Sequence, residues 1–339
     1  MKNRIGIDVG RKLSVEDAIV WASKNDVKYI DCQIDVEPNS LYSFNDGRCQ
    51  SIKHDCESKN IVLGLHTLSS VNVAEFSPFV GEAVDTYLKA YVDAAARLNA
   101  DWIVVHAGYH FTDDYKIRRQ AALERLQRIV DYAEKNGVLL LLENTNWEPE
   151  RAEVHYFIYN LEELNYFMEK IESPHLGWSF TINHATLVPE GIEGFVKNGP
   201  TNRLGEVRMA DNNGEYELHM QPGTGIIDWK KMFNLVEATG YEGHYMNAFG
   251  SLEDMLEDGR RMFPREADLF YRLCRLYFAD RPAKALDAIE HALKLQEPQE
   301  EWCMLKGEIL VRLGRHAQAI QWFRSIQGQF SGRDLQEYV

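Results

Sequence analysis

Three apolar segments of the sequence end in a side chain that can bind a metal or move a proton. Ile61–His66 and Trp102–His106 each end in a histidine, and Val138–Glu143 ends in a carboxylate. Two imidazoles and one carboxylate form the facial arrangement that holds a divalent ion and leaves positions open. If the segments are neighbouring parallel strands, these side chains meet at one end of a sheet. We therefore predict a metal site at His66, His106 and Glu143.

Further candidates follow in the second half of the chain. We predict catalytic roles for His184, Arg208 and His219 beside Glu143, because histidine near neutral pH serves as acid or base. The planar guanidinium of Arg208 suits a carboxylate or phosphate, so we also expect it to bind substrate. The structural alternatives are an ion pair of Arg208 with Asp211 or Glu143, and a hydrogen bond that involves His184 and His219.

Three other residues complete the predicted substrate-binding set. Asp211 follows a predicted strand, Asn247 ends another, and Trp178 lies within a third. A tryptophan in a strand suits core packing at least as well as contact with a sugar ring.

Short apolar segments alternate with amphipathic ones over most of the chain, and this alternation positions the candidates. The predicted strands are Arg4–Asp8, Tyr29–Ile34, Ile61–His66, Trp102–His106, Val138–Glu143, His175–Phe180, Glu206–Ala210 and Gly243–Asn247. The predicted helices are Ser14–Asn25, Asp46–Lys59, Pro78–Asn99, Asp114–Asn136, Leu161–Ile171, Glu190–Lys197 and Asp228–Thr239. Such alternation predicts parallel strands with right-handed crossovers, and its length predicts an α/β fold of the (β/α)8 TIM barrel type. A doubly wound sheet is the alternative, but no glycine-rich phosphate turn follows the first strand.

The sequence from about Pro264 onward is helical throughout. Pairs of residues match at a 34-residue offset, namely Ala285 with Ala319, Ile289 with Phe323 and Leu276 with Leu310. Together with Gly307 and Gly314, this spacing is typical of tetratricopeptide helix pairs, although ordinary helical hairpins remain the alternative. We predict a barrel domain over residues 1–262 and a small all-α appendage over residues 263–339. We expect the appendage to serve in a homo-oligomer or to contact a protein partner.

Composition limits the function further. The chain has 339 residues, of which 45% are hydrophobic and 26% are charged, as in globular proteins. Its net charge of −15 disfavours nucleic acid as a partner. The longest strongly apolar run, Val138–Leu142, is far shorter than the roughly 20 residues that span a bilayer, so we expect no membrane partner. No secretory signal opens the sequence, and its 5 cysteines are scattered. We expect a cytoplasmic protein with free thiols.

An ordered series of short motifs resembles the xylose isomerase-like TIM barrel superfamily. The motifs are Leu65-His-Thr-Leu-Ser, Val105-His-Ala-Gly, Leu142-Glu-Asn-Thr, Phe180-Thr-Ile-Asn-His, Val207-Arg-Met-Ala-Asp-Asn and Glu217-Leu-His-Met-Gln-Pro-Gly-Thr-Gly. This superfamily includes sugar phosphate isomerases and epimerases and the AP endonuclease family 2. The resemblance covers about three quarters of the chain. It implies a barrel with its site at the C-terminal ends of the strands.

The resemblance also implies a divalent metal ion, and here the chain departs from the pattern. Isomerases of this kind use four ligands, of which Glu143 is the first. The positions of the other ligands read Thr181, Arg208 and Asn247, and an arginine cannot serve as a ligand. A Mn, Mg or Zn ion is therefore predicted on a divergent set of residues. The proton-shuttling glutamate pair is reduced to one carboxylate.

The nuclease-type members use additional histidines. Their counterparts are His66, His106, His184 and His219, and Glu217 stands where that group has an aspartate. Because the central metal position is lost and the chain is strongly acidic, a role in DNA repair is disfavoured.

Three functions remain in view. The first is an isomerase or epimerase that acts on a sugar, keto-sugar or sugar acid by proton transfer next to a carbonyl. Glu143 would be a ligand or base, His66 and His106 ligands or proton carriers, and Arg208 an anion clamp. The second is a decarboxylase or dehydratase of a keto-acid, because Arg208 suits a carboxylated substrate. The third is a barrel that binds a ligand or a partner without catalysis.

Overall fold

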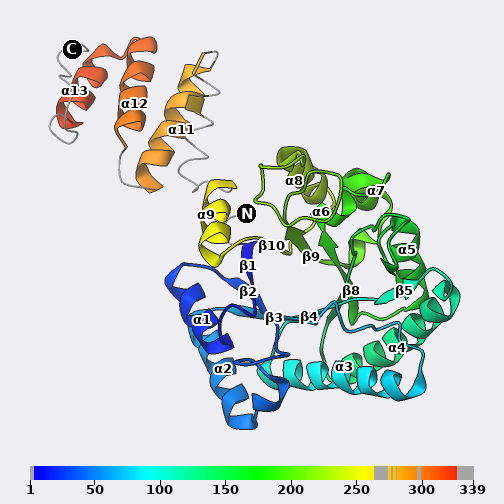
Figure 1. Ribbon diagram of the computed structural model, residues 1–339. Helices are drawn as coiled ribbons and strands as arrows, with labels where there is room; N and C mark the ends of the chain where they lie inside the picture. Colours follow the sequence, from blue (N-terminus) through cyan, green and yellow to red (C-terminus); the bar gives the residue numbers. More distant parts are fainter. Residues whose placement is uncertain (1–3, 263–273, 276–277, 280, 296–298, 327–339) are drawn as a thin grey trace. The chain divides into compact units, whose positions relative to one another are not determined.

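A closed parallel barrel forms the core of the protein. The computed structural model describes residues 4–262, 274–275, 278–279, 281–295 and 299–326 (Figure 1). In this part of the chain, parallel strands close a ring in the order β1-β10-β9-β8-β6-β4-β3-β2. They are β1 (Ile5–Gly10), β2 (Tyr29–Cys32), β3 (Val62–His66), β4 (Trp102–Val105), β6 (Leu140–Glu143), β8 (Leu176–Thr181), β9 (Leu204–Met209) and β10 (His244–Asn247). This ring confirms the predicted TIM barrel and excludes the doubly wound sheet.

Helices surround the barrel, as Figure 1 shows. They are α1 (Val15–Lys24), α2 (Asp46–Lys59), α3 (Pro78–Leu98), α4 (Tyr115–Lys135), α5 (Leu161–Lys170), α6 (Ile182–Ala185), α7 (Gly191–Asn198), α8 (Trp229–Glu237) and α9 (Leu252–Met262), with short 3-10 turns at Leu41–Ser43 and Thr201–Arg203. Pro78 occupies the first turn of α3, where its missing N–H costs nothing. Asn60 and Asn99 end α2 and α3 with φ of 55° and 56°, the left-handed conformation that terminates a helix.

Apolar side chains fill the barrel near the N-terminal ends of its strands. Trp102 packs there with Val104, Leu141 and Met246. Gly64 on the neighbouring strand makes room for the indole, because a Cβ at this position would lie 2.1 Å from the Trp102 ring. This filled end leaves polar side chains to gather at the C-terminal ends of the strands, where (β/α)8 enzymes have their active sites.

A strand pair in the barrel domain was not predicted, and neither were the helices α6 and α9. The short strands β5 (Tyr109–Phe111) and β7 (Val154–Tyr156) form an antiparallel pair that joins the loops after β4 and β6. In this pair Tyr109 lies opposite Tyr156. Three-residue strands are too short for an alternating pattern to be recognised in the sequence.

The C-terminal part forms a unit of its own. Contacts divide the chain between Gly259 and Arg260, and the helices beyond are α11 (Pro282–Leu295), α12 (Glu300–Arg312) and α13 (His316–Ile326). The residues matched at the 34-residue offset are buried, namely Ala285, Ile289, Leu310, Ala319 and Phe323. A Cβ at Gly307 would lie 2.0 Å from the Phe323 ring, so α12 and α13 need a glycine here. The tetratricopeptide assignment, the boundary at residue 262 and the role in partner contacts stay predictions. Leu276 and the segment 263–273 lie outside the described residues.

Two expectations from composition can be compared with the structure. All five cysteines are free and buried. Among the described helices, none combines the length and apolar character that crossing a membrane requires.

Candidate active site

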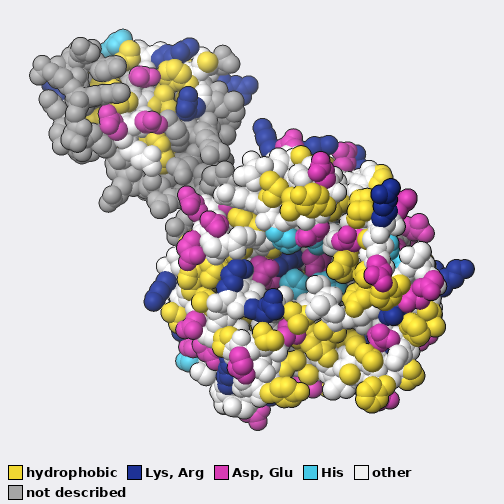
Figure 2. Space-filling view, in the orientation of Figure 1, with side chains coloured by type: hydrophobic (Ala, Val, Ile, Leu, Met, Phe, Trp, Pro, Cys, Tyr) yellow, Lys and Arg dark blue, Asp and Glu magenta, His cyan; other side chains and the backbone are white. Residues whose placement is uncertain are grey.

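A cavity of about 370 Å³ lies at the C-terminal ends of the barrel strands. Figure 2 shows histidine, acidic and basic side chains gathered in the hollow at the centre of the barrel face. Predicted site residues on its wall are His66, His106, Glu143, His184, Arg208 and His219. A concave site with converging titratable groups at this end of a barrel is the expected place for substrate.

The first histidine group comprises His66 at the end of β3, His106 just after β4, and Glu143 at the end of β6. The two histidine Nε2 atoms are 3.4 Å apart. Glu143 Oε2 lies 3.4 Å from Nε2 of His66 and 3.0 Å from Nε2 of His106. Three ligands about 2.1 Å from one tetrahedral ion lie roughly 3.4 Å apart, so this spacing suits a divalent cation. The structure thus brings together the three side chains that were predicted to bind a metal.

Glu143 is buried and held as an anion. Burial alone would raise the pKa of its carboxyl, but hydrogen bonds with His106 and His66 lower that pKa well below its usual range. The hydroxyl of Thr181, at the end of β8, donates to Glu143 Oε1 at 2.5 Å. Thr181 stands at the position where the resemblance implies an aspartate ligand, and here its hydroxyl orients Glu143.

The second histidine group comprises His184 in α6 and Glu217 and His219 in the loop after β9. Oε1 of Glu217 lies 3.6 Å from Nε2 of His184 and 2.6 Å from Nε2 of His219. The Nδ1 atoms of the two histidines are bound to the carbonyl oxygens of Asn144 and Ala248, at 2.8 and 2.5 Å. Such carbonyl contacts fix the tautomer of a metal-binding histidine and leave Nε2 as the ligand. The hydrogen bonds of both histidines to loop carbonyls agree with the structural alternative, and Glu217 lies between the two Nε2 atoms, nearer to His219.

The arginine group comprises Arg208 on β9 and three carboxylates. Nη1 of Arg208 donates to Asp31 Oδ2 at 2.5 Å and to Glu206 Oε1 at 3.1 Å, and Nη2 donates to Asp8 Oδ2 at 2.5 Å. The ion-pair partners of Arg208 are therefore neither Asp211 nor Glu143, which were the two named from the sequence.

Burial and charge set the protonation of this group. Burial alone would lower the pKa of Arg208, but the charges of Asp31 and Glu206 raise it well above its usual range. Burial raises the pKa of the Asp31 carboxyl to about 8. For Glu206, burial is outweighed by Arg208 and by a 2.8 Å contact with His244, and the pKa falls to about 2. Because Asp8, Asp31 and Glu206 already accept its hydrogen bonds, the guanidinium is not a free anion clamp.

Three predicted substrate-binding residues lie outside the cavity wall. The carboxylate of Asp211 is buried and accepts hydrogen bonds from the backbone N–H groups of Gly223 and Ile227 and from the indole of Trp229, so it shapes the loop after β9. Trp178 is fully buried beside Phe180 and Phe195. Asn247 is also fully buried, and its Nδ2 donates to Met255 O at 2.9 Å. Asn247 Oδ1 has no hydrogen-bond partner among the described residues, and the substrate-binding role of these three residues stays a prediction.

The cavity wall also contains residues that were not singled out from the sequence, among them Asp8, Glu148 and Tyr156. Asp8 ends the apolar segment Arg4–Asp8, so the rule that found His66 and Glu143 also applies to it. Tyr156 reaches the cavity from β7 and Glu148 from the loop before it. No local pattern marks these two, because the unpredicted hairpin positions them.

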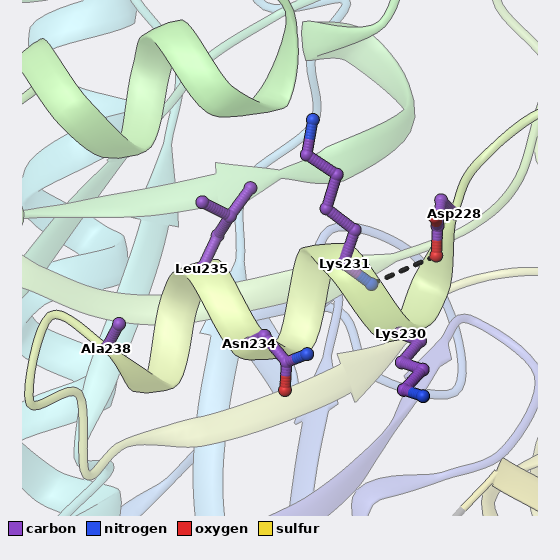
Figure 3. Close-up of a pocket in the computed structure, with 6 residues that line it drawn as sticks. All are labelled: Asp228, Lys230, Lys231, Asn234, Leu235 and Ala238. Carbon is purple, nitrogen blue, oxygen red and sulfur yellow. Dashed lines mark hydrogen bonds between the residues drawn. The ribbon is translucent and has the colours of Figure 1, made fainter.

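A second pocket of about 350 Å³ is lined by residues of α8 and its two ends, which Figure 3 shows. Asp228, Lys230, Lys231 and Asn234 supply its polar groups. Asp228 accepts a hydrogen bond from the backbone N–H of Lys231 at 3.0 Å and so caps the helix. Lys231 Nζ is bound to Glu193 of α7 at 2.6 Å, so Asp228 and Lys231 are engaged in local contacts, and the barrel cavity is the better candidate site.

Comparison with known proteins agrees with this fold. The uncharacterized protein MJ1614 of Methanocaldococcus jannaschii is 24% identical over 208 residues, which cover 60% of this chain and 74% of that protein. Among solved structures, a D-tagatose 3-epimerase-like protein superposes with a TM-score of 0.66 and 19% identity, over 76% of this chain and 95% of the other. A D-psicose 3-epimerase determined in the presence of D-fructose gives 0.64 and 17%, over 80% and 98%. At these identities the two structures show a shared fold.

The sequence itself matches a family model, described as xylose isomerase-like TIM barrel, over residues 19–265. This match spans most of the barrel and includes every member of the first and second histidine groups. The chain therefore belongs to the xylose isomerase-like TIM barrel family.

Proposed function

We propose that the protein is a sugar isomerase or epimerase that moves a proton at a carbon next to a carbonyl. The observation that carries this proposal is the first histidine group. It presents a buried carboxylate anion, Glu143, on the wall of a polar cavity beside two imidazoles. The similar fold of structures described as D-tagatose 3-epimerase-like and D-psicose 3-epimerase supports a neutral sugar as the substrate class.

The donor atoms of both histidine groups fit divalent cations. Each group offers two imidazoles and one carboxylate, with all three ligand atoms within 4.8 Å of one another. Nε2 of His184 is buried and has no hydrogen-bond partner among the described residues, a cost that a bound cation would remove. His66, His106 and Glu143 would hold one ion, and His184, Glu217 and His219 a second. When bound, a divalent ion supplies polarisation of the substrate carbonyl.

Glu143 is the proposed base. Its lowered pKa keeps it ionised at neutral pH, and the Thr181 hydroxyl fixes the orientation of the carboxylate. A carboxylate held in this way is preorganised to take the proton from the substrate carbon, because it needs no reorientation before the reaction. The buried wall around it excludes bulk water and strengthens each electrostatic contact.

The alternative keto-acid lyase is less well supported than it was from the sequence. Its motivation was an arginine ready to bind a substrate carboxylate. Arg208 donates instead to Asp8, Asp31 and Glu206. The geometry therefore favours substrates that need no anion clamp.

The test is incubation with D-fructose, D-tagatose and D-psicose in D₂O, with Mn²⁺ added, followed by NMR. We expect a sugar isomer with deuterium at a carbon next to the carbonyl, and no such product with the Glu143→Gln variant. Products of lower mass from keto-acid probes, with all three sugars unchanged, would contradict the proposal and support a lyase.

A further inference from the structure

The cavity contains more than one carboxylate that could act on a substrate. Among the described residues, those on its wall are Asp8, Glu143, Glu148 and Glu217. Glu217 is engaged in the second histidine group. Glu148 accepts a hydrogen bond from Asn146 at 2.6 Å and lies in the loop that leaves β6, so it shares the side of Glu143. Apart from Glu143 itself, Asp8 is therefore the remaining carboxylate on the cavity wall.

Asp8 and Glu143 lie on opposite strands of the ring. Asp8 is near the C-terminal end of β1, and Glu143 is at the C-terminal end of β6. In the closed order, β2, β3 and β4 separate these two strands on one side, and β10, β9 and β8 separate them on the other. Because both side chains line the same cavity, a substrate between them exposes opposite faces to the two carboxylates.

The arginine group directs Asp8 toward this cavity. Asp31 and Glu206 are fully buried, whereas the side chain of Asp8 is 21% exposed. Oδ2 of Asp8 is bound to Arg208, and its Oδ1 has no hydrogen bond from the described residues. Of the three carboxylates on Arg208, Asp8 alone lines the cavity. One oxygen is thus anchored while the other is free to reach substrate.

The neighbouring strand explains why the carboxylate comes from β1. Asn247 on β10 pairs with Ile7, the residue before Asp8. The side chain of Asn247 is buried and bound to Met255, so it does not line the cavity. Asp8 on β1 therefore presents a carboxylate on the strand next to β10, where Asn247 has an amide instead of a carboxylate.

We infer that Asp8 is the second acid–base residue and that the pair Asp8 and Glu143 makes the enzyme an epimerase. The inference rests on the proposed function. Glu143 takes the proton from the carbon next to the carbonyl. The electron pair of the broken C–H bond moves toward the carbonyl, and an enediolate forms. Asp8, after its free oxygen Oδ1 has taken a proton from solvent, gives that proton to the opposite face of the same carbon, and the carbonyl re-forms. The configuration inverts, and the two carboxyl groups exchange protons with solvent.

The test compares two isotope readouts in one reaction. The Mn²⁺-loaded enzyme is incubated in D₂O with D-fructose or D-psicose, and NMR measures the epimer formed and the deuterium in the recovered sugar. In Asp8→Asn we expect epimer formation to fall about 100-fold or more, the usual contribution of one acid or base. Deuterium still enters the recovered sugar, because Glu143 removes and returns the proton on its own face.

Glu206→Gln is the matched control, since it also removes a carboxylate from Arg208 but lies away from the cavity. We expect it to keep the wild-type ratio of epimer to recovered deuterated sugar, and thermal unfolding shows that each variant is folded. If Asp8→Asn lowers both readouts in proportion, or neither, the inference is wrong while the proposed function stands. If the wild-type enzyme produces neither, the proposed function fails and the inference fails with it.

Discussion

Two kinds of charged cluster lie at the same end of the barrel, and they differ in how they are neutralised. In the arginine group one guanidinium donates to three carboxylates, and Asp31 Oδ1 is buried without a hydrogen-bond partner among the described residues. In each of the first and second histidine groups, ring nitrogens instead point at a shared carboxylate, and Nε2 of His184 has no hydrogen-bond partner among the described residues. In the arginine group every carboxylate is bound to one guanidinium, whereas the ring nitrogens of the histidine groups converge where a cation can bind. Charge alone does not separate the two, because each contains buried ionised groups.

The largest effect is expected at Glu143. Glu143→Gln removes the proposed base and a ligand of the first histidine group, so we expect sugar turnover to fall by about a thousandfold or more. Thr181→Val removes only the hydrogen bond to Glu143, and a loss of about 10- to 100-fold is expected, as for residues that orient a ligand. Both are measured by NMR. Equal losses in the two variants would show that orientation, not the carboxylate, limits the reaction.

The arginine group should respond in stability. Arg208→Met leaves Glu206 buried without its main counter-charge, and we expect the free energy of unfolding to fall by about 3–5 kcal/mol. Urea unfolding of the metal-free protein provides the measurement. Arg128→Met is a control on an exposed ion pair with Asp85, where about 1 kcal/mol or less is expected. A similar small loss for Arg208 would mean that the group is not held together by its charges.

The second histidine group should titrate. Burial alone would lower the pKa of His219, but its hydrogen bond with Glu217 raises it above the ordinary value of 6.5. In the metal-free protein this pair therefore stabilises the fold at pH below about 6.5, and the stabilisation is lost as pH rises through the higher folded-state pKa. Glu217→Gln should lower the pKa of His219, measured by NMR titration. An unchanged pKa would contradict the pairing.

Proton competition gives this group a second signature. A cation must displace the proton from His219, so its binding should weaken as pH falls through the raised pKa. Titration calorimetry with Zn²⁺ at several pH values measures this dependence. Affinity that does not change across this range would show that the ion avoids His219.

The smallest effect is expected from removal of the C-terminal helices. Every member of the three clusters lies between Asp8 and His219, within the first of the two units. A chain that ends at residue 262 should fold and keep its metal content and sugar turnover. An unfolded truncated chain would show that the barrel depends on the later helices.

The barrel and the first histidine group could be predicted because both follow from local patterns. His66 and Glu143 directly end apolar strands, His106 follows one, and the C-terminal ends of parallel strands meet at one end of a barrel. The partners of Arg208 could not be predicted in this way. Asp8 is 200 residues distant in the sequence, and closure of the ring brings it close.

Loop geometry was also hidden from the sequence. Glu217 and His219 meet His184 because Asp211, from within the same loop, binds backbone N–H groups further along it. Asp211 therefore resembled a site residue while acting as a structural one. Asn247 ends β10 as expected, but its Nδ2 donates to Met255 O, which its place in the sequence does not indicate.

The most direct test of this account is elemental analysis of the wild-type protein and two variants after exposure to a divalent metal. The account predicts two ions per chain, one for each histidine group, and one ion in either His106→Ala or His219→Ala. The fixed positive charge of Arg208 already engages its three carboxylates, so we expect no third cation beside it. A folded wild-type protein that retains no ion, or whose ion content is unchanged in both variants, would contradict the assignment of the histidine groups as cation sites.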